Sequence, residues 1–198
     1  MSDFQLYFEI GLRHVLDING YDHMLFLIVL TVPYAFRDWK KVLLLVTLFT
    51  IGHTLSLIVS VFGSLPLDTI VIEFLIPITI LLTALYNIFT SAKKSSASKP
   101  AGMNFIAITT LCFGIIHGLG FSNYFKVLLP VDSGDKLLPL LEFALGIETA
   151  QIIVVMAVLI LTFIVQDMLR LQRRDWILVT SSFVAGVAVT MIAGSEIW

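Results

Sequence analysis

The chain has 198 residues, of which 58% are hydrophobic and 13% are charged. A soluble core of this size cannot enclose that much apolar surface, so the composition excludes an ordinary soluble domain and predicts an all-α integral membrane protein. The 12 basic and 14 acidic residues nearly balance and form no basic stripe, which argues against a nucleic-acid partner. The single cysteine, Cys112, excludes an internal disulfide and is typical of a small apolar position in a membrane helix.

The N-terminal segment carries no basic region or cleavage site of a secretory signal, so Met1 is expected to belong to the mature protein. Residues 4–16 mix apolar side chains with Glu9, Arg13 and His14, and they are too few and too polar to span a bilayer. They predict a helix that lies at the membrane interface or against the bundle. The first span is expected at residues 20–36, where Pro33 kinks or ends it.

The later apolar segments each approach or exceed the roughly 20 residues that a bilayer requires. They lie at residues 42–62, 67–89, 104–121, 138–165 and 176–193. Residues 91–102 (SAKKSSASKPAG) predict a flexible cytoplasmic linker between two sets of three spans. The sequence therefore predicts one membrane domain, residues 1–198, with six transmembrane helices and an N-terminal interfacial helix.

Lysines and arginines gather in alternate loops. The loops after the first, third and fifth spans hold three each, whereas the other two loops hold none and two. Because short basic loops stay in the cytoplasm, both termini are expected on the outer side. The inner membrane of a bacterium is the simplest location for such a chain.

Four of the expected spans each carry one side chain that can bind a metal: His23, His53, His117 and Glu148. With a rise of about 1.5 Å per residue, all four fall between the midplane and the outer surface. Ionisable groups are costly inside a membrane, and this shared depth predicts one common site. Imidazoles with a carboxylate are the ligand set expected for zinc, nickel or cobalt.

Three further residues are candidates for this site. Asp22, next to His23, is expected to hold an imidazole in place or to attract cations. His14 and Asp17 are weaker candidates, because two polar residues three apart are also typical of a solvated helix face. The alternative for each single histidine is an interhelical hydrogen bond without any metal.

At these residues the chain resembles the HupE/UreJ family of small integral membrane proteins, particularly its second branch. The resemblance rests on the segments GYDHMLFL (20 to 27), FTIGHTLSL (49 to 57), FGIIHGLGF (113 to 121) and GIETAQ (146 to 151). The family is associated with nickel or cobalt uptake, so the resemblance implies a metal permease. By match, it gives the metal-handling role to Asp22, His23, His53, His117 and Glu148. The segment from His14 to Asp22 is longer than in the family's pattern.

Two other functions fit the same residues. One is an intramembrane zinc-dependent hydrolase that acts on a lipid or a membrane-anchored substrate, with Glu148 or Asp22 as general base. The other is an accessory protein of the membrane that a metal stabilises. The expected partners are the lipid bilayer and a metal ion. A protein partner and a homo-oligomer both stay open.

Overall fold

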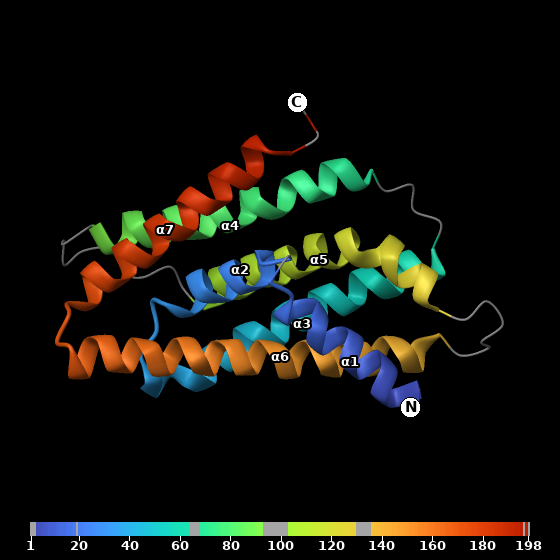
Figure 1. Cartoon of the computed structure of the whole chain (residues 1–198), viewed down its shortest axis with the longest axis horizontal. Coiled ribbons are helices and arrows are strands. Elements are labelled where there is room, and N and C mark those ends of the chain that lie inside the picture. The colour runs from blue at the N-terminus through green and yellow to red at the C-terminus, as the bar shows by residue number, and fades with distance from the viewer. Residues whose placement is uncertain are drawn as a thin grey trace.

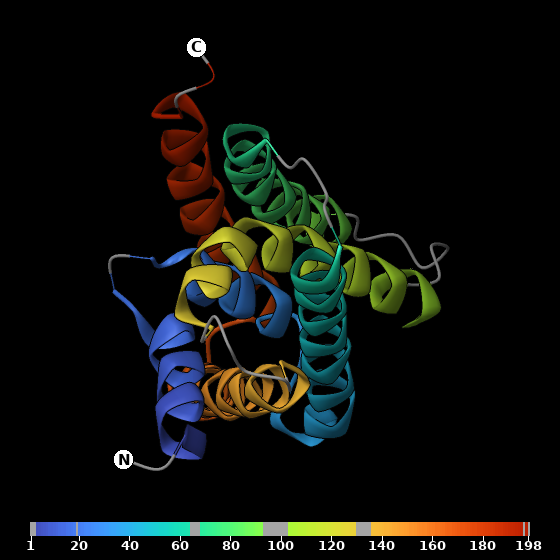
Figure 2. The same cartoon turned by 90° about the vertical axis from the view of Figure 1, so that its right-hand side faces the viewer.

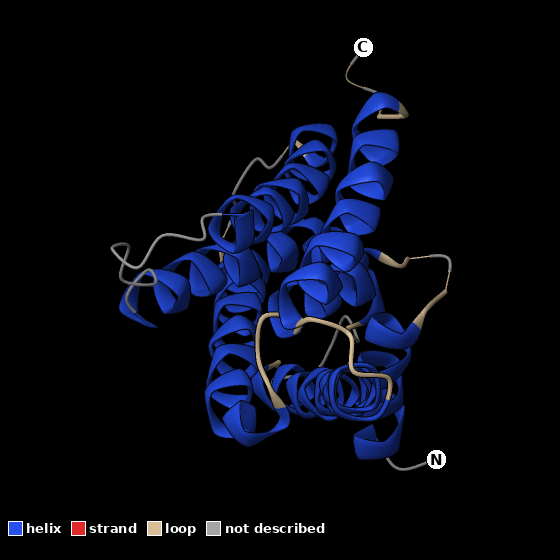
Figure 3. Cartoon of the chain, turned by 90° about the vertical axis from the view of Figure 1, so that its left-hand side faces the viewer, coloured by secondary structure: helices blue, strands red, loops and turns tan. Residues whose placement is uncertain are grey.

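The computed structural model describes residues 3–18, 20–63, 68–92, 103–129, 136–195 and 197. All regular structure in these residues is helical, which confirms the all-α class (Figure 3). The α-helices are α1 (Asp3–Leu16), α2 (Asp22–Thr31), α3 (Trp39–Phe62), α4 (Thr69–Ala92), α5 (Met103–Leu128), α6 (Leu137–Phe163) and α7 (Arg173–Ala193). A short 3-10 turn (Phe36–Asp38) precedes α3, and a π-helical turn (Ile164–Met168) extends α6.

Within the described residues, five helical segments are long and apolar enough to cross a bilayer. They are Phe36–Phe62, Thr69–Ser91, Ile106–Leu128, Leu137–Met168 and Arg173–Ala193. Each contains most of one predicted span, so a membrane protein that crosses the bilayer several times is confirmed. Of the predicted linker at 91–102, the first two residues end α4 and residues 93–102 lie outside the described part of the chain.

The segment predicted as the first span, 20–36, forms a much shorter helix. α2 has 10 residues, or about 15 Å, which is half of the hydrocarbon thickness. It ends before Pro33, which has no N–H for the carbonyl of Val29. Asn87 of α4 donates its side-chain N–H to that carbonyl instead, at 2.7 Å. The predicted count of six spanning helices is therefore not confirmed.

α1 packs against α6 along the bundle, which is one of the two positions expected for residues 4–16. A Cβ atom at Gly11 would collide with the carbonyl of Phe143, and one at Gly146 with the carbonyl of Phe8. Backbones that approach so closely are typical of small residues at membrane helix crossings. An interfacial position for α1 is not confirmed.

The helices form three layers that Figures 1 and 2 show from perpendicular directions. α4 and α7 pair in one outer layer, α2 and α5 lie in the middle, and α1, α3 and α6 form the opposite side. α1 and α2 follow one another along the long axis of the bundle, with α1 on the right and α2 on the left in Figure 1. The two short helices thus divide a length that α3 or α6 covers alone, and the described residues between them, such as Ile18 and Tyr21, are exposed at the surface of the bundle.

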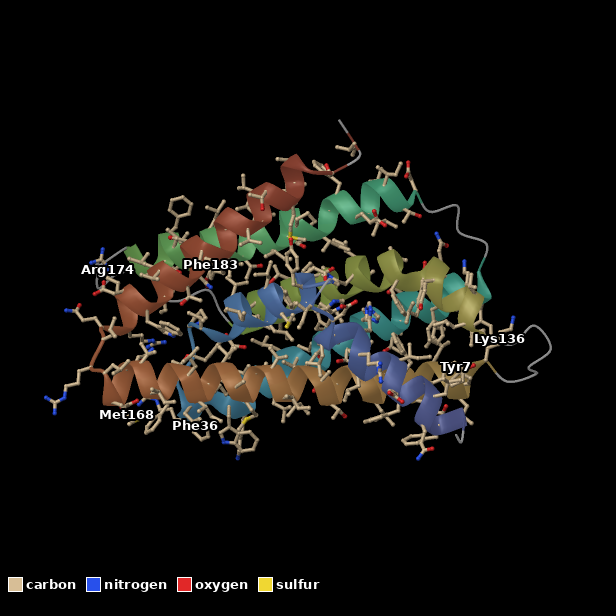
Figure 4. The ribbon with its side chains drawn as sticks, in the orientation of Figure 1. Tyr7, Phe36, Lys136, Met168, Arg174 and Phe183 are labelled. Atoms are coloured by element: carbon tan, nitrogen blue, oxygen red, sulfur yellow. The ribbon has the colours of Figure 1, made fainter. Side chains whose placement is uncertain are left out.

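Two of the basic loops lie at the same end of the bundle. Phe36, Met168 and Arg174 lie at one end, and Tyr7 and Lys136 lie at the other (Figure 4). The two basic loops that contain the first three of these residues therefore share a side, as the alternating pattern of lysines and arginines predicts. That this side faces the cytoplasm stays a prediction.

Candidate metal centre

Four histidines and one aspartate from α1, α2, α3 and α5 meet inside the bundle. Their ligand atoms form two groups, each with all distances within 4.8 Å, and His23 belongs to both. The first group is His14, His23 and His53, and the second is Asp22, His23 and His117. We call these five residues the histidine cluster. The structure thus brings together His23, His53, His117 and Asp22, together with the weaker candidate His14.

The crossing of α3 and α5 places His53 beside His117. A Cβ atom at Gly114 would collide with the carbonyl of Phe49, and one at Gly118 with the carbonyl of His53. Such contacts show that the two helix backbones touch without any side chain between them. Two glycines of the motif FGIIHGLGF, Gly114 and Gly118, therefore allow the close approach of α5 to α3 that brings the backbones around His117 and His53 together.

The crossing of α1 and α6 positions His14 in the same way, because Gly11 stands one turn before it. The ring of His14 lies 3.9 Å from the ring of Phe121 and 4.6 Å from the ring of His23, measured between centroids. It also lies 5.9 Å from the ring of His53. His14 therefore joins the cluster from a helix that sequence reasoning expected at the interface.

The imidazoles lie among aromatic rings, and most of their nitrogens have no hydrogen-bond partner in the described structure. His53 is 0% exposed, and neither of its ring nitrogens has a hydrogen bond in the described structure. The Nε2 atoms of His14 and His23 also have none. The rings of Phe49, Phe113 and Phe143 surround these groups. Each unsatisfied buried polar group costs about 1–3 kcal/mol, so a bound ion or an ordered water at these nitrogens would stabilise the arrangement.

Asp22 links two of the histidines. Its Oδ1 atom lies 3.2 Å from Nδ1 of His23, and its Oδ2 atom lies 3.2 Å from Nε2 of His117. The second contact is close, but its geometry is not that of a hydrogen bond, and Nε2 of His117 has no hydrogen-bond partner in the described structure. A carboxylate that holds Nδ1 of His23 leaves the Nε2 atom of that ring for a metal.

Asp22→Asn is expected to weaken the binding of Ni²⁺ or Co²⁺ by about 10–100-fold, because the imidazoles lose the carboxylate that orients them. Isothermal titration of the purified protein in detergent measures this change. Asp17→Asn is the matched control, since it removes the same charge from an exposed side chain outside both groups. An equal loss in both variants would mean that only the overall charge of this segment matters.

Glu148 lies in a separate polar group between α3 and α6. Its Oε1 atom accepts a hydrogen bond of 2.6 Å from Thr47, and its Oε2 atom accepts one from Thr50. Thr50 also lies 2.9 Å from Oε1 of Gln151. Since Thr50 is three residues before His53, this group is displaced from the cluster by about one helical turn. Glu148 and Asp17 both lie outside the two groups of metal-capable side chains.

The sequence contains a pattern that could have placed His14 in the cluster: a glycine three residues before the histidine. His14, His23 and His117 each follow a glycine by three residues, in GLRH, GYDH and GIIH. In α1 and α5 that glycine is the point where two helix backbones touch, one turn from the histidine. A search for glycine and histidine at this spacing would have placed His14 with the other histidines.

The donor set suits a borderline divalent cation. Neutral imidazole nitrogens bind zinc, nickel and cobalt well, and Asp22 supplies one compensating negative charge. The unpartnered nitrogens on four buried or half-buried rings fit such an ion better than they fit a hydrogen-bonded network.

The fold and the site together define a helical membrane protein that crosses the bilayer several times around a buried group of histidines. A family model described as HupE / UreJ protein matches residues 1–195. The chain therefore belongs to the HupE/UreJ family, which confirms the resemblance of its motifs, including the second branch. Searches of curated proteins and of solved structures gave no match to the chain.

Proposed function

We propose that this protein is a permease for a divalent transition-metal ion, with nickel or cobalt as the transported ion. The observation that carries the proposal is the set of unpartnered imidazole nitrogens that separate helices bring together in the bundle. The HupE/UreJ family is associated with nickel and cobalt uptake, which supports the choice of ions. We propose the inner membrane of a bacterium as the location, with both termini outside.

Within this proposal the two groups of the histidine cluster have different roles. His14, His23 and His53 offer three imidazoles to an ion that arrives from the outer side. His23 also belongs to the group with Asp22 and His117. An ion can therefore pass from one group to the other while it keeps one ligand. This sharing supports transport, because strong binding alone would be served by one fixed set of ligands.

The break between α1 and α2 also supports transport. Many transporters bind their substrate where a membrane helix is interrupted, because the backbone there can rearrange. His14 lies two residues before the end of α1, and Asp22 begins α2. A small change at this junction would alter the distances between His14 and His23 without moving the long helices.

Flux into proteoliposomes tests this proposal. We expect radiolabelled Ni²⁺ or Co²⁺ to enter liposomes that contain the protein, with saturation at rising concentration. Protein-free liposomes and liposomes with His53→Leu are expected to show background entry only. Stoichiometric metal binding without any flux would rule out transport and leave the site itself intact.

An intramembrane zinc-dependent hydrolase is the second candidate, and a cavity beside the cluster favours it. The cavity has a volume of about 1010 Å³, large enough for part of a lipid. Phe26 and Phe113 line it, and the ring of Phe113 lies 4.8 Å from the ring of His117. None of the residues that line the cavity belongs to the cluster, so a substrate in it does not reach the imidazoles. This separation favours the permease.

A further inference from the structure

A cavity between α2, α4 and α5 is a feature that the metal site does not use. Most of its exposed wall surface is apolar and includes Leu30, Leu82 and Ile116, while α4 also contributes polar side chains such as Thr79 and Thr83. Phe26 and Phe113, whose ring centroids are 4.0 Å apart, separate its inner end from the histidine cluster. The cavity is therefore a compartment of its own next to the metal site.

The cavity opens sideways to the hydrocarbon of the bilayer. Leu82 of α4 lines it and is 59% exposed, and Thr109 and Cys112 of α5 line it and are also exposed. Leu82 and Cys112 lie inside two segments that are long enough to span the membrane, and Thr109 lies near the start of the second segment. A cavity that opens at this depth is in contact with acyl chains. Its apolar lining makes an acyl chain a better occupant than water or a hydrated ion.

One end of the cavity is polar and basic. Lys41 and Arg173 line this end together with Tyr34 and Asp38. Arg173 follows directly on the loop before α7, at the end of the bundle where Figure 4 shows Arg174. Two cations against one carboxylate leave this end with an excess of positive charge. A bound amphiphile would therefore place an anionic group here.

Both cations retain hydrogen-bonding capacity for such a group. Nζ of Lys41 lies 2.7 Å from Asp38, but the lysine side chain is exposed, and such a pair contributes little stability. Arg173 donates one N–H to the carbonyl of Pro33, out of the five N–H groups that a guanidinium carries. Guanidinium and ammonium groups are the usual ligands of phosphate, and basic pockets between membrane helices bind anionic head groups.

We propose that this cavity is a binding site for an anionic phospholipid. One acyl chain enters between α4 and α5 past Leu82 and Cys112, and the phosphate lies against Lys41 and Arg173. The cavity takes no part in holding the metal, since no lining residue belongs to the histidine cluster. The proposal therefore stands whether the protein is a permease or a hydrolase.

Native mass spectrometry of the protein released from detergent tests the head-group part. Phosphatidylglycerol and phosphatidylcholine with identical chains are the probes. We expect the wild type to retain phosphatidylglycerol preferentially. The pair Lys41→Gln with Arg173→Gln is expected to lower its affinity roughly 30-fold, since each basic residue near anionic lipid contributes about fivefold. Equal retention of the two lipids by the wild type would overturn the proposal.

A matched pair of substitutions distinguishes this site from general electrostatic attraction. Lys40→Gln with Arg174→Gln removes the same two charges from exposed neighbours that do not line the cavity. This control is expected to retain phosphatidylglycerol like the wild type. An equal loss in both pairs would overturn the proposal. Unchanged metal binding in all variants shows that the fold is intact, and the two single variants replace any pair that does not fold.

The chain part has a separate test at the opening between α4 and α5. Cys112→Trp fills this opening with a large side chain and leaves both cations in place. We expect at least a fivefold loss of phosphatidylglycerol retention, whereas Cys112→Ser should behave like the wild type. Full retention by Cys112→Trp would overturn the placement of the acyl chain in the cavity.

Discussion

His53→Leu is expected to abolish metal binding and yet leave the metal-free protein as stable as the wild type, or more stable. The substitution removes one imidazole of the first group, so the affinity for Ni²⁺ or Co²⁺ should fall by about 100-fold or more. Both ring nitrogens of His53 are buried without a partner, and an apolar side chain removes their desolvation cost of about 1–3 kcal/mol each. Titration with metal and thermal unfolding in detergent measure the two effects.

The combination of these two results distinguishes a metal ligand from a structural histidine. If His53 held helices together through hydrogen bonds, the substitution would destabilise the protein and leave its metal binding unchanged. Ser60→Ala is the control on the same helix, because it too removes a buried polar group without a hydrogen-bond partner, in this case a hydroxyl. It lies about two turns from His53 and should leave the affinity for metal unchanged. Wild-type binding by His53→Leu would remove His53 from the site.

Hydropathy alone predicted most of the fold. The five later spans needed no knowledge of tertiary contacts, because in a bilayer every backbone group must bond within its own helix. Long apolar runs such as residues 42–62 and 138–165 therefore become helices at nearly the expected bounds. The linker at 91–102 was predicted from polar composition, and it stays a prediction because residues 93–102 lie outside the described part of the chain.

The first span could not be predicted in the same way, because its length depends on tertiary contacts. Residues 20–36 are apolar enough for one helix, but the helix ends after 10 residues. Pro33 cannot donate a backbone hydrogen bond to the buried carbonyl of Val29, and the side chain of Asn87 on α4 donates one to it instead. Such a contact over 58 residues of sequence does not show in a hydropathy pattern.

Depth along the membrane predicted which residues come close, but not the direction in which each points. His53 and Glu148 lie at similar depth, within about one helical turn of each other. Glu148 turns towards Thr47 and Thr50 on α3, whereas Phe143 of the same helix lies 6.2 Å from the ring of His53. The rotation of α6 about its axis, set by the contact of Gly146 with α1, decides between them. Rotation of this kind needs coordinates.

Gly114→Ala is expected to lower both the stability and the metal affinity of the protein, although it adds a single methyl group. The new Cβ would collide with the backbone carbonyl of Phe49, which cannot move without shifting α3. Overpacking of this kind costs about 1–3 kcal/mol. Because His117 stands one turn after Gly114, the shift also moves His117 away from His53 on α3, and we expect about a 10-fold loss of affinity. Thermal unfolding and metal titration of the purified variant measure both changes.

Gly186→Ala on α7 is the matched control, because no atom lies within 4 Å of the position that its Cβ would take. The same methyl group should there raise helix stability by about 0.5–1 kcal/mol, since glycine is the poorer helix former. Metal affinity should stay at the wild-type value. If Gly114→Ala behaved like this control, α3 and α5 would tolerate a wider separation than the structure gives them. The close crossing would then not be what holds His53 and His117 together.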